Sequence, residues 1–213
     1  MIAADFIRAN LRLEPVPALP QIQLYTAYPG SRLSRLASPD GAAPYWAYAW
    51  AGGLALAQHV VQRSELVTGK RVLDLGAGSG LVGIAAALAG AQVSAAEIDP
   101  YGCAAIALNA AANGVNLPLA EIDIAGEVPN AFEMILAGDV FYLPEVAARM
   151  LPFLDRCVRA GIAVLIGDPG RRDLPVDRLI EVASYPVADV GDVRNRSERV
   201  GMVYALNPQQ TSS

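Results

Sequence analysis

The side chains best suited to chemistry are three carboxylates, each at the end of a predicted strand. Asp74 belongs to the first apolar run of the regular part of the chain, Glu97 follows the second, and Asp123 follows the third. Glu97 stands about 20 residues after Gly76, the spacing at which a carboxylate holds ribose hydroxyls in nucleotide-binding βαβ units. Asp123 can accept a hydrogen bond from an adenine amine, and Asp74 can lie beneath a cation. We therefore expect a site for a nucleoside that carries positive charge and no phosphate.

A glycine-rich turn leads from the first of these runs into a predicted helix. The turn reads Gly-Ala-Gly-Ser-Gly over residues 76–80, and such a turn lets the backbone approach a ligand closely at a helix N-terminus. A phosphate-binding Walker loop is excluded because the Gly-Lys-Ser/Thr ending is missing. The dinucleotide pattern Gly-x-Gly-x-x-Gly matches Gly78, Gly80 and Gly83, but it should begin directly at the strand end, which here is Gly76. A dinucleotide therefore fits less well than the charged nucleoside.

The composition narrows the class of protein and its partners. The chain has 213 residues, 54% hydrophobic and 17% charged, so we expect a soluble globular domain with one core. Its net charge of -5 argues against nucleic acid as a partner, because binding to phosphates needs a basic face. No apolar run reaches the ~18 residues of a membrane span, so we expect no membrane partner.

The cysteine and histidine content bears on metals and on the cellular compartment. Cys103 and Cys157 lie far apart and His59 is the only histidine, so we expect no structural metal. His59 is more simply explained as a core or surface residue than as a base. Unpaired thiols suit a reducing compartment, and the first ten residues lack a secretory leader pattern, so we expect a cytoplasmic protein.

Apolar runs and helical patterns alternate from residue 70 onward, which predicts an α/β fold with a doubly wound, Rossmann-like sheet of seven strands. The last two strands are joined by too short a linker for a crossover, so they should form an antiparallel C-terminal hairpin. The expected strands cover 72–75, 92–96, 118–122, 134–137, 162–166, 185–190 and 200–206. One expected helix follows the glycine turn and ends at residue 88, and three others cover 101–112, 145–158 and 176–183.

Two further expectations concern proline-containing segments. Residues 1–43 contain a short helix near 5–13 and a proline-rich extended piece, and we assign them to an N-terminal extension that precedes the main domain, residues 44–213. Pro152 lies inside the helix expected over 145–158, where proline removes a hydrogen bond, so a kink or two shorter helices are expected there.

The glycine turn and the strand before it, Val72-Leu-Asp-Leu-Gly-Ala-Gly-Ser-Gly80, resemble the first motif of the class I, seven-β-strand S-adenosylmethionine methyltransferases. The resemblance implies S-adenosyl-L-methionine as the cofactor. It implies that Trp50 covers the adenine or the methionine tail, although the aromatic stretch 45–50 can also be read as a core stripe. The cofactor-binding residues expected on these grounds are Trp50, Asp74, Gly76, Ala77, Gly78, Gly80, Glu97 and Asp123.

Three short stretches resemble one branch of that superfamily, the lysine methyltransferases of the electron transfer flavoprotein β-subunit. They cover 44–53, 138–142 and 166–171. The resemblance implies a protein-lysine acceptor, with Asp139 orienting the amine and with Phe141 and Tyr142 walling its channel. The expected catalytic residues are therefore Asp139 and Tyr142. A purely structural alternative is that Asp139 caps the helix that follows it.

Other functions stay open at this point. The acceptor can instead be a small-molecule amine or a ribosomal protein, and the chain can be a non-catalytic module that binds the cofactor. Methylation of a base amine would call for an Asn/Asp-Pro-Pro-Tyr/Phe element after the fourth strand, and the chain lacks it. Residues 168–170 read as turn chemistry, and Arg171 with Arg172 reads as either a solvated rim or a docking surface.

Overall fold

Six strands form one mixed sheet in the order β4-β3-β5-β6-β8-β7. The computed structural model describes residues 3–36, 44–188 and 198–207. Its helices, strands and short 3-10 turns are α1 (Ala3–Asn10), β1 (Arg12–Val16), β2 (Leu19–Thr26), η1 (Leu33–Leu36), η2 (Tyr45–Ala47), α2 (Ala51–Gln62), η3 (Ser64–Leu66), β3 (Arg71–Leu75), α3 (Leu81–Leu88), β4 (Gln92–Ala96), α4 (Pro100–Ala112), β5 (Met134–Gly138), α5 (Pro144–Arg159), β6 (Ala163–Asp168), η4 (Val176–Arg178), β7 (Leu179–Ala188) and β8 (Glu198–Leu206).

The four strands β4, β3, β5 and β6 run parallel, and β8 pairs antiparallel with both β6 and β7. The parallel strands are apolar along nearly their whole length because helices cover both faces of the sheet. Their carboxyl ends lie at one edge, which we call the carboxyl edge, and ligands of such sheets bind there. The predicted α/β class and the antiparallel C-terminal hairpin are confirmed.

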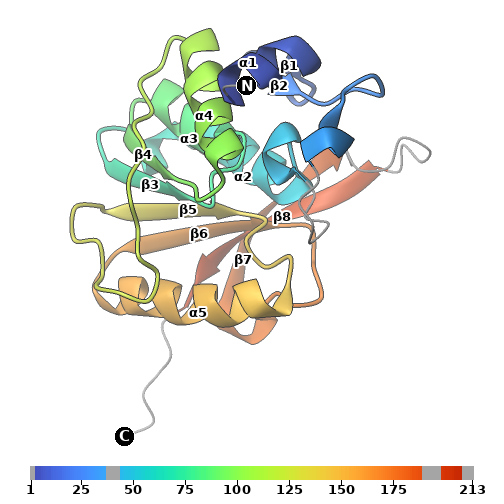
Figure 1. Cartoon of the computed structure of the whole chain (residues 1–213). Coiled ribbons are helices and arrows are strands. Elements are labelled where there is room, and N and C mark those ends of the chain that lie inside the picture. The colour runs from blue at the N-terminus through green and yellow to red at the C-terminus, as the bar shows by residue number, and fades with distance from the viewer. Residues whose placement is uncertain (1–2, 37–43, 189–197, 208–213) are drawn as a thin grey trace, which may run out of the picture.

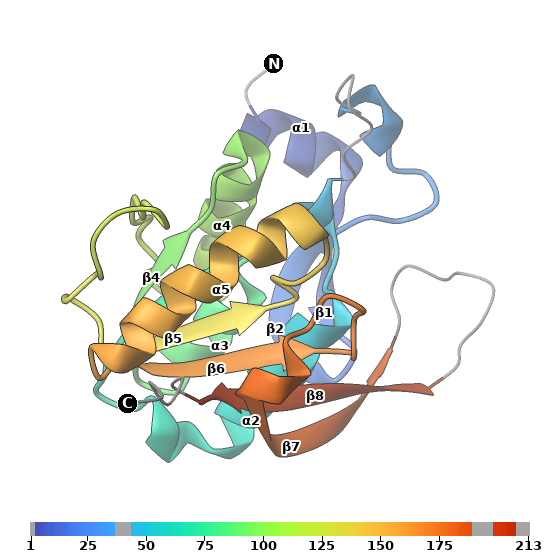
Figure 2. The same ribbon diagram turned by 90° about the horizontal axis from the view of Figure 1, so that it is seen from below.

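Helices form a layer on each face of the sheet. Helices α2, α3 and α4 lie on one face, and α5 crosses the other (Figures 1 and 2). Two buried clusters reflect this division: one joins α2 and α3 to the sheet, and the other contains Phe153 and Leu154 of α5 packed against inward-facing side chains such as Leu73 and Ile135.

The N-terminal segment packs against the main domain. Strands β1 and β2 form a separate antiparallel pair, and Ile22 and Leu24 of β2 belong to the same buried cluster as α2 and α3. Phe6 of α1 meets Tyr101 of α4 edge to face, with ring centroids 5.9 Å apart. The expected short helix is present, while the extended piece forms strands. The boundary at residue 43 stays a prediction.

The strand expected over 118–122 is wrong. Leu119 forms only a single bridge, to Ala95, whose N–H donates to the carbonyl of Pro118 and whose carbonyl accepts from Ala120. Pro118 has no N–H with which to extend the ladder, and Leu119 is 51% exposed. The sheet therefore has six strands among the described residues, instead of the expected seven.

Two helix predictions also need correction. Residues 176–183 are not a helix, because after the short turn η4 the chain pairs along the whole length of β8 as strand β7. Pairing with β8 therefore decides the conformation of this segment, although the spacing of its apolar residues is helical. The alternative of two shorter helices is wrong, since α5 continues through Pro152 as one helix, and the expected kink stays a prediction. Pro152 is exposed, so the carbonyl that loses its partner there can bond to water.

Two smaller expectations can also be compared with the fold. His59 is buried, and its Nδ1 lies 3.0 Å from the hydroxyl of Tyr185, so the expected core histidine is confirmed. The expected linker around Gly191 lies outside the described residues. Within the part of the chain that the structure describes, no helix is both long enough and apolar enough to cross a membrane.

Candidate active site

The glycine turn between β3 and α3 requires glycine at three positions. Gly76, Gly78 and Gly80 have φ angles of 68°, 53° and 80°, in the left-handed region that side chains with a Cβ disfavour. The N–H groups of Gly76 and Ala77 both donate to the carbonyl of Ala96, at 3.0 and 3.1 Å. The turn is therefore tied to the end of β4, with its backbone at the carboxyl edge.

Glu97 joins the glycine turn to the segment after β4. One carboxylate oxygen accepts from the N–H of Gly78 at 2.8 Å, and the other accepts from Ile98 and Asp99 at 2.7 and 2.9 Å. These bonds place the carboxylate beside the turn, as expected from the spacing. Ile98 was not singled out from the sequence, and it is 96% exposed. It leaves an apolar surface next to Glu97.

Asp74 lies under the turn and contacts helix α3. It is 1% exposed, and its Oδ2 accepts from the N–H of Gly83 at 2.8 Å. Burial raises the pKa of Asp74 to about 7, and the bond from Gly83 acts against this shift. The carboxylate fixes the start of α3 in the structure, and its contact with a ligand stays a prediction.

Asp123 does not follow a strand. Its side chain is exposed, and its Oδ1 accepts from the N–H of Ala125 at 2.9 Å within a turn that ends at Gly126. The expectation of three carboxylates at three successive strand ends is therefore wrong for this residue, because the preceding strand does not form. Glu97 and Asp74 remain associated with the glycine turn.

Asp139 follows β5 at the carboxyl edge in an unusual backbone conformation. It is the one non-glycine residue with positive φ in the described part of the chain, at 56°. Its N–H donates to the carbonyl of Gly167, and its Oδ2 accepts from the N–H of Gly53 at 2.8 Å. The alternative that Asp139 caps the following helix is wrong, since its carboxylate caps α2, while α5 begins at Pro144 after Leu143, without a side-chain cap.

Close packing of glycines brings α2 to this carboxylate. Gly138 and Gly167 are aligned on the neighbouring strands β5 and β6. A Cβ on Gly138 would lie 2.9 Å from the Cα of Gly53, and a Cβ on Gly52 would collide with the carbonyl of Gly167. The N-terminus of α2 therefore rests directly on the sheet, and its free N–H groups favour an anion there.

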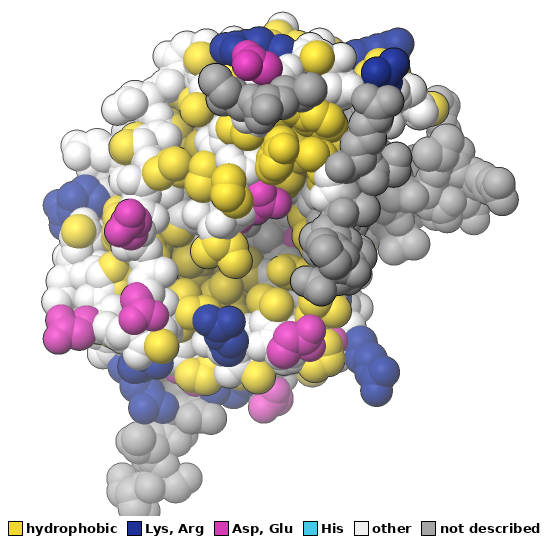
Figure 3. All heavy atoms as spheres, viewed as in Figure 1, with side chains coloured by type: hydrophobic (Ala, Val, Ile, Leu, Met, Phe, Trp, Pro, Cys, Tyr) yellow, Lys and Arg dark blue, Asp and Glu magenta, His cyan; other side chains and the backbone are white. Residues whose placement is uncertain are grey.

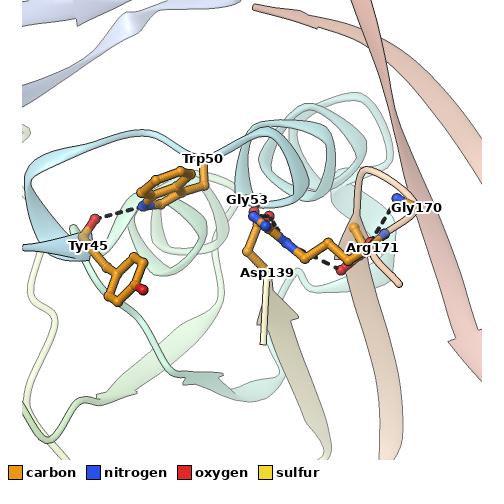
Figure 4. A network of polar contacts seen from close by, with 7 residues as sticks. Tyr45, Trp50, Gly53, Asp139, Gly170 and Arg171 are labelled. Carbon is orange, nitrogen blue, oxygen red and sulfur yellow. Dashed lines mark hydrogen bonds and ion pairs between the residues drawn. The ribbon is translucent and has the colours of Figure 1, made fainter. Parts of the chain in front are cut away.

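Arg171, from the turn after β6, forms an ion pair with Asp139. Its Nη2 and Nε lie 2.5 and 3.1 Å from Oδ1 of Asp139, as Figure 4 shows. Asp139 is 9% exposed. Burial raises the pKa of Asp139, and Arg171 acts in the opposite direction. The description of Arg171 as a solvated rim is wrong, and no local spacing revealed this contact across two strands.

A second carboxylate, Asp168, lies behind this pair. It is fully buried, and its Oδ1 accepts from the N–H groups of Gly170 and Arg171 at 2.8 and 2.7 Å. Its Oδ2 has no hydrogen-bond partner among the described residues and lies 3.9 Å from Nε of Arg171. Burial raises the pKa of Asp168 to about 6. The sequence indicated only a turn here, whereas the structure shows one arginine between two carboxylates.

Aromatic side chains surround the same edge. The indole of Trp50 donates to the carbonyl of Tyr45 at 2.8 Å, and the rings of Tyr45 and Tyr142 lie 4.9 Å apart. Trp50 is half-buried and Tyr142 is 37% exposed. Burial raises the pKa of the Tyr142 hydroxyl. Phe141 is fully buried in the core beneath, so it cannot line an accessible channel.

The arrangement can position a nucleophile beside a cofactor. Figure 3 shows a hollow near the middle of this face, with hydrophobic side chains around it and acidic atoms visible inside it. Val140, next to Asp139, lies 3.2 Å from the position of a Cβ on Gly76, so the glycine turn and the end of β5 are adjacent. The structure thus brings the predicted residue Asp139 close to the predicted glycine turn, and the predicted residues Trp50 and Tyr142 both contact Tyr45.

Comparison with known proteins identifies relatives of this arrangement. A family model described as ribosomal protein L11 methyltransferase (PrmA) matches residues 54–164. The electron transfer flavoprotein beta subunit lysine methyltransferase of Rattus norvegicus is 36% identical over 172 residues, which cover 78% of this chain and 68% of the relative.

Solved structures share the fold. Ribosomal protein L11 methylase from Lactobacillus delbrueckii subsp. bulgaricus has a TM-score of 0.51 at 23% identity, over 71% of this chain and 77% of that one. Pyrococcus abyssi tRNA (uracil-54, C5)-methyltransferase, in complex with S-adenosyl-L-homocysteine, has a TM-score of 0.51 at 18% identity, over 70% of this chain and 38% of that one. The chain belongs to the PrmA-type family of class I methyltransferases and is a methyltransferase.

Proposed function

We propose that the protein transfers a methyl group from S-adenosyl-L-methionine to a lysine side chain of another protein, the electron transfer flavoprotein β-subunit. The relative that is 36% identical over most of the chain carries that activity in its name. The observation that carries the proposal is the placement of Asp139, a buried carboxylate whose partner Arg171 lies over the ring of Trp50, beside the glycine turn. This is an environment for an alkylammonium group.

The residues at the carboxyl edge fit this cofactor. The left-handed glycines let the backbone approach the ligand without a Cβ in the way. Glu97 is held by three N–H donors, and a carboxylate in this position can accept from ribose hydroxyls. Exposed Ile98 offers an apolar surface for an adenine ring, and half-buried Trp50 can cover the ligand. The bound cofactor supplies an electrophilic methyl on a sulfonium.

The protein's own groups orient the amine and exclude water. Methyl transfer to an amine is an in-line displacement, so positioning contributes more than acid–base strength. A lysine ammonium must first lose a proton, which goes to water, and the C–N bond then forms as the C–S bond breaks and S-adenosyl-L-homocysteine leaves. We expect Asp139 to hold the lysine nitrogen by charge and hydrogen bonding. We expect Tyr142 and Tyr45 to pack against the aliphatic part of the lysine side chain. The bond from Gly53 fixes the orientation of the Asp139 carboxylate.

The net charge and the cysteines bear on the partner and on the cellular location. The net charge of -5 favours a protein acceptor over nucleic acid, because phosphate contacts need basic side chains. The cytoplasmic location remains a prediction from the unpaired cysteines Cys103 and Cys157.

The direct test incubates the purified protein with methyl-labelled S-adenosyl-L-methionine and purified flavoprotein β-subunit, followed by peptide mass spectrometry. We expect methyl-lysine on the β-subunit, and an initial rate of labelling about 100-fold lower when Asp139→Asn is used. Ribosomal protein L11 serves as a second acceptor, because the matching family model carries its name. Label on L11 alone would replace the proposed substrate, and labelling at an undiminished rate with Asp139→Asn would reject the role of this carboxylate.

A further inference from the structure

We propose that Arg171 occupies the place of the substrate's ammonium group on Asp139 and moves to the unpaired oxygen of Asp168 when the substrate enters. The inference rests on the proposed amine acceptor and adds a positioning residue to that site. It begins from the chemistry of the contacts that Arg171 makes.

Arg171 is a cation between a carboxylate and an aromatic face. Two of its nitrogens bond to Oδ1 of Asp139, and its guanidinium carbon lies 6.0 Å from the ring centroid of Trp50. A lysine ammonium that approaches Asp139 needs the same kind of environment. The internal cation and the substrate cation therefore compete for one position.

The competition concerns a single oxygen atom. Oδ2 of Asp139 already accepts from the N–H of Gly53 at 2.8 Å, and the position of Gly53 is set by the glycine contacts beneath α2. The oxygen that can change partner is Oδ1, to which Arg171 is bound. An ammonium reaches it when the guanidinium withdraws.

Asp168 provides the second position for the guanidinium. Its Oδ2 is buried without a hydrogen-bond partner among the described residues, and lies 3.9 Å from Nε of Arg171. Leaving such an atom unsatisfied costs free energy. The other oxygen of Asp168 accepts from the backbone N–H groups of Gly170 and Arg171 and so holds this turn in place. The exchange therefore needs only a rotation of the Arg171 side chain.

The charge balance favours the exchange. With both carboxylates ionised, the site holds two negative charges and one arginine. A substrate ammonium completes two ion pairs, Asp139 with the substrate and Asp168 with Arg171. A buried carboxylate oxygen without a hydrogen bond is costly, and a bond from the guanidinium to Oδ2 of Asp168 removes this cost. The free site is thus one positive charge short of balance.

The kinetic test uses Asp168→Asn alone and combined with Arg171→Met. For Asp168→Asn we expect the KM for the acceptor protein to rise about 10-fold with kcat changed less than about 3-fold, since the displaced arginine loses its charged partner. In the double variant we expect an acceptor KM near that of the unaltered enzyme, because there is no arginine left to displace. A purely structural role predicts a double variant at least as impaired as the single one, and that result would overturn the proposal.

The matched control is Arg178→Met. Arg178 forms a bidentate pair with Asp155, at 3.0 and 2.6 Å, on side chains that are 11% and 13% exposed. This pair joins the start of β7 to the second half of α5, so the variant should leave the acceptor KM unchanged. An equal rise in KM for Arg178→Met would mean that general destabilisation explains the effect.

A second measurement does not depend on methyl transfer. The Nε–H NMR signal of Arg171, assigned with Arg171→Lys, is followed during titration with n-butylammonium chloride. We expect a saturable shift that Asp168→Asn weakens about 10-fold in affinity. A signal that stays unmoved at every concentration would overturn the displacement even if the enzyme methylates the flavoprotein subunit. A moving signal with no transfer to any protein would instead reject the proposed acceptor and retain Arg171 as an exchangeable cation.

Discussion

Two arginine–aspartate pairs lie at opposite edges of the sheet, and their surroundings differ. At the edge where the parallel strands begin, which we call the amino edge, Arg178 contacts both oxygens of Asp155 and also donates to the carbonyl of Asn207. At the carboxyl edge, Arg171 contacts one oxygen of Asp139 and leaves an oxygen of the neighbouring Asp168 without a hydrogen bond. The first pair makes all its hydrogen bonds to groups of the protein. Beside the second pair, one carboxylate oxygen lacks a hydrogen bond within the described part of the chain, so this site can accept a further cation.

The difference shows that an ion pair by itself says little about function. Both pairs are partly buried, and both join segments distant in the chain. The pair at the carboxyl edge also has an aspartate with a φ of 56° and a helix N-terminus placed against it by closely packed glycines. Strained backbone conformations of this kind are retained where the surrounding structure enforces them, often at active sites. The variants below test whether the pair at the carboxyl edge serves methyl transfer and the pair at the opposite edge serves only the stability of the fold.

The largest expected effect is the loss of methyl transfer in Asp139→Asn. We expect kcat to fall by a factor of about 10² or more, since the amide cannot carry the charge that orients an ammonium. Asp155→Asn is the control at the opposite edge, and its kcat should stay close to that of the unaltered enzyme. Steady-state kinetics with the acceptor protein measures both. A similar fall for the two variants would remove the functional distinction between the edges.

The second effect concerns how closely α2 approaches the sheet. Gly52→Ala should lower the free energy of unfolding by about 3 kcal/mol, because its Cβ would meet the backbone carbonyl of Gly167. Gly53→Ala is the matched control, since its Cβ would have ordinary contacts, the nearest at 3.9 Å from Val82. Urea unfolding of both variants gives the comparison. Equal stabilities would show that α2 can move away from Asp139 at little cost.

A smaller effect is expected on cofactor affinity. Glu97→Ala should weaken binding of S-adenosyl-L-methionine by about 1–3 kcal/mol, through lost charged hydrogen bonds. Glu133→Ala is the control, because Glu133 accepts from the N–H of Arg71 at the amino edge and should not affect the cofactor. Titration calorimetry separates the two variants. An unchanged affinity in Glu97→Ala would refute the assignment of this carboxylate to the ribose.

The last effect is a pH dependence of stability that originates at Asp74. Its pKa rises from 3.8 to about 7 on folding because of burial, so between about pH 4 and 7 the folded state binds more protons than the unfolded state. Stability should therefore fall as the pH rises through this window. Replacing Asp74 with Asn should remove its share of the slope, at most about 1.4 kcal/mol per pH unit. Urea unfolding at pH 5 and pH 7 tests this, and parallel profiles would contradict it.

Residue patterns predicted the central βαβ units and the glycine turn well. The turn is encoded locally, because only glycine adopts the backbone angles at residues 76, 78 and 80 without strain. The prediction failed at 118–122 and 176–183, where pairing with a neighbouring strand decides the conformation. The placement of Asp123 at a strand end failed for the same reason.

The sequence by itself determined the class of fold, the glycine turn, and the identity of the acidic and aromatic residues near it. It could not determine which charges meet. The bond between Asp139 and Arg171 spans 32 positions, and it forms because β5 and β6 are neighbours and α2 lies directly on their glycines. Local propensities act over a few residues, whereas burial and charge pairing depend on which elements pack together. For that reason, only the tertiary structure decided that a single arginine lies between two buried carboxylates.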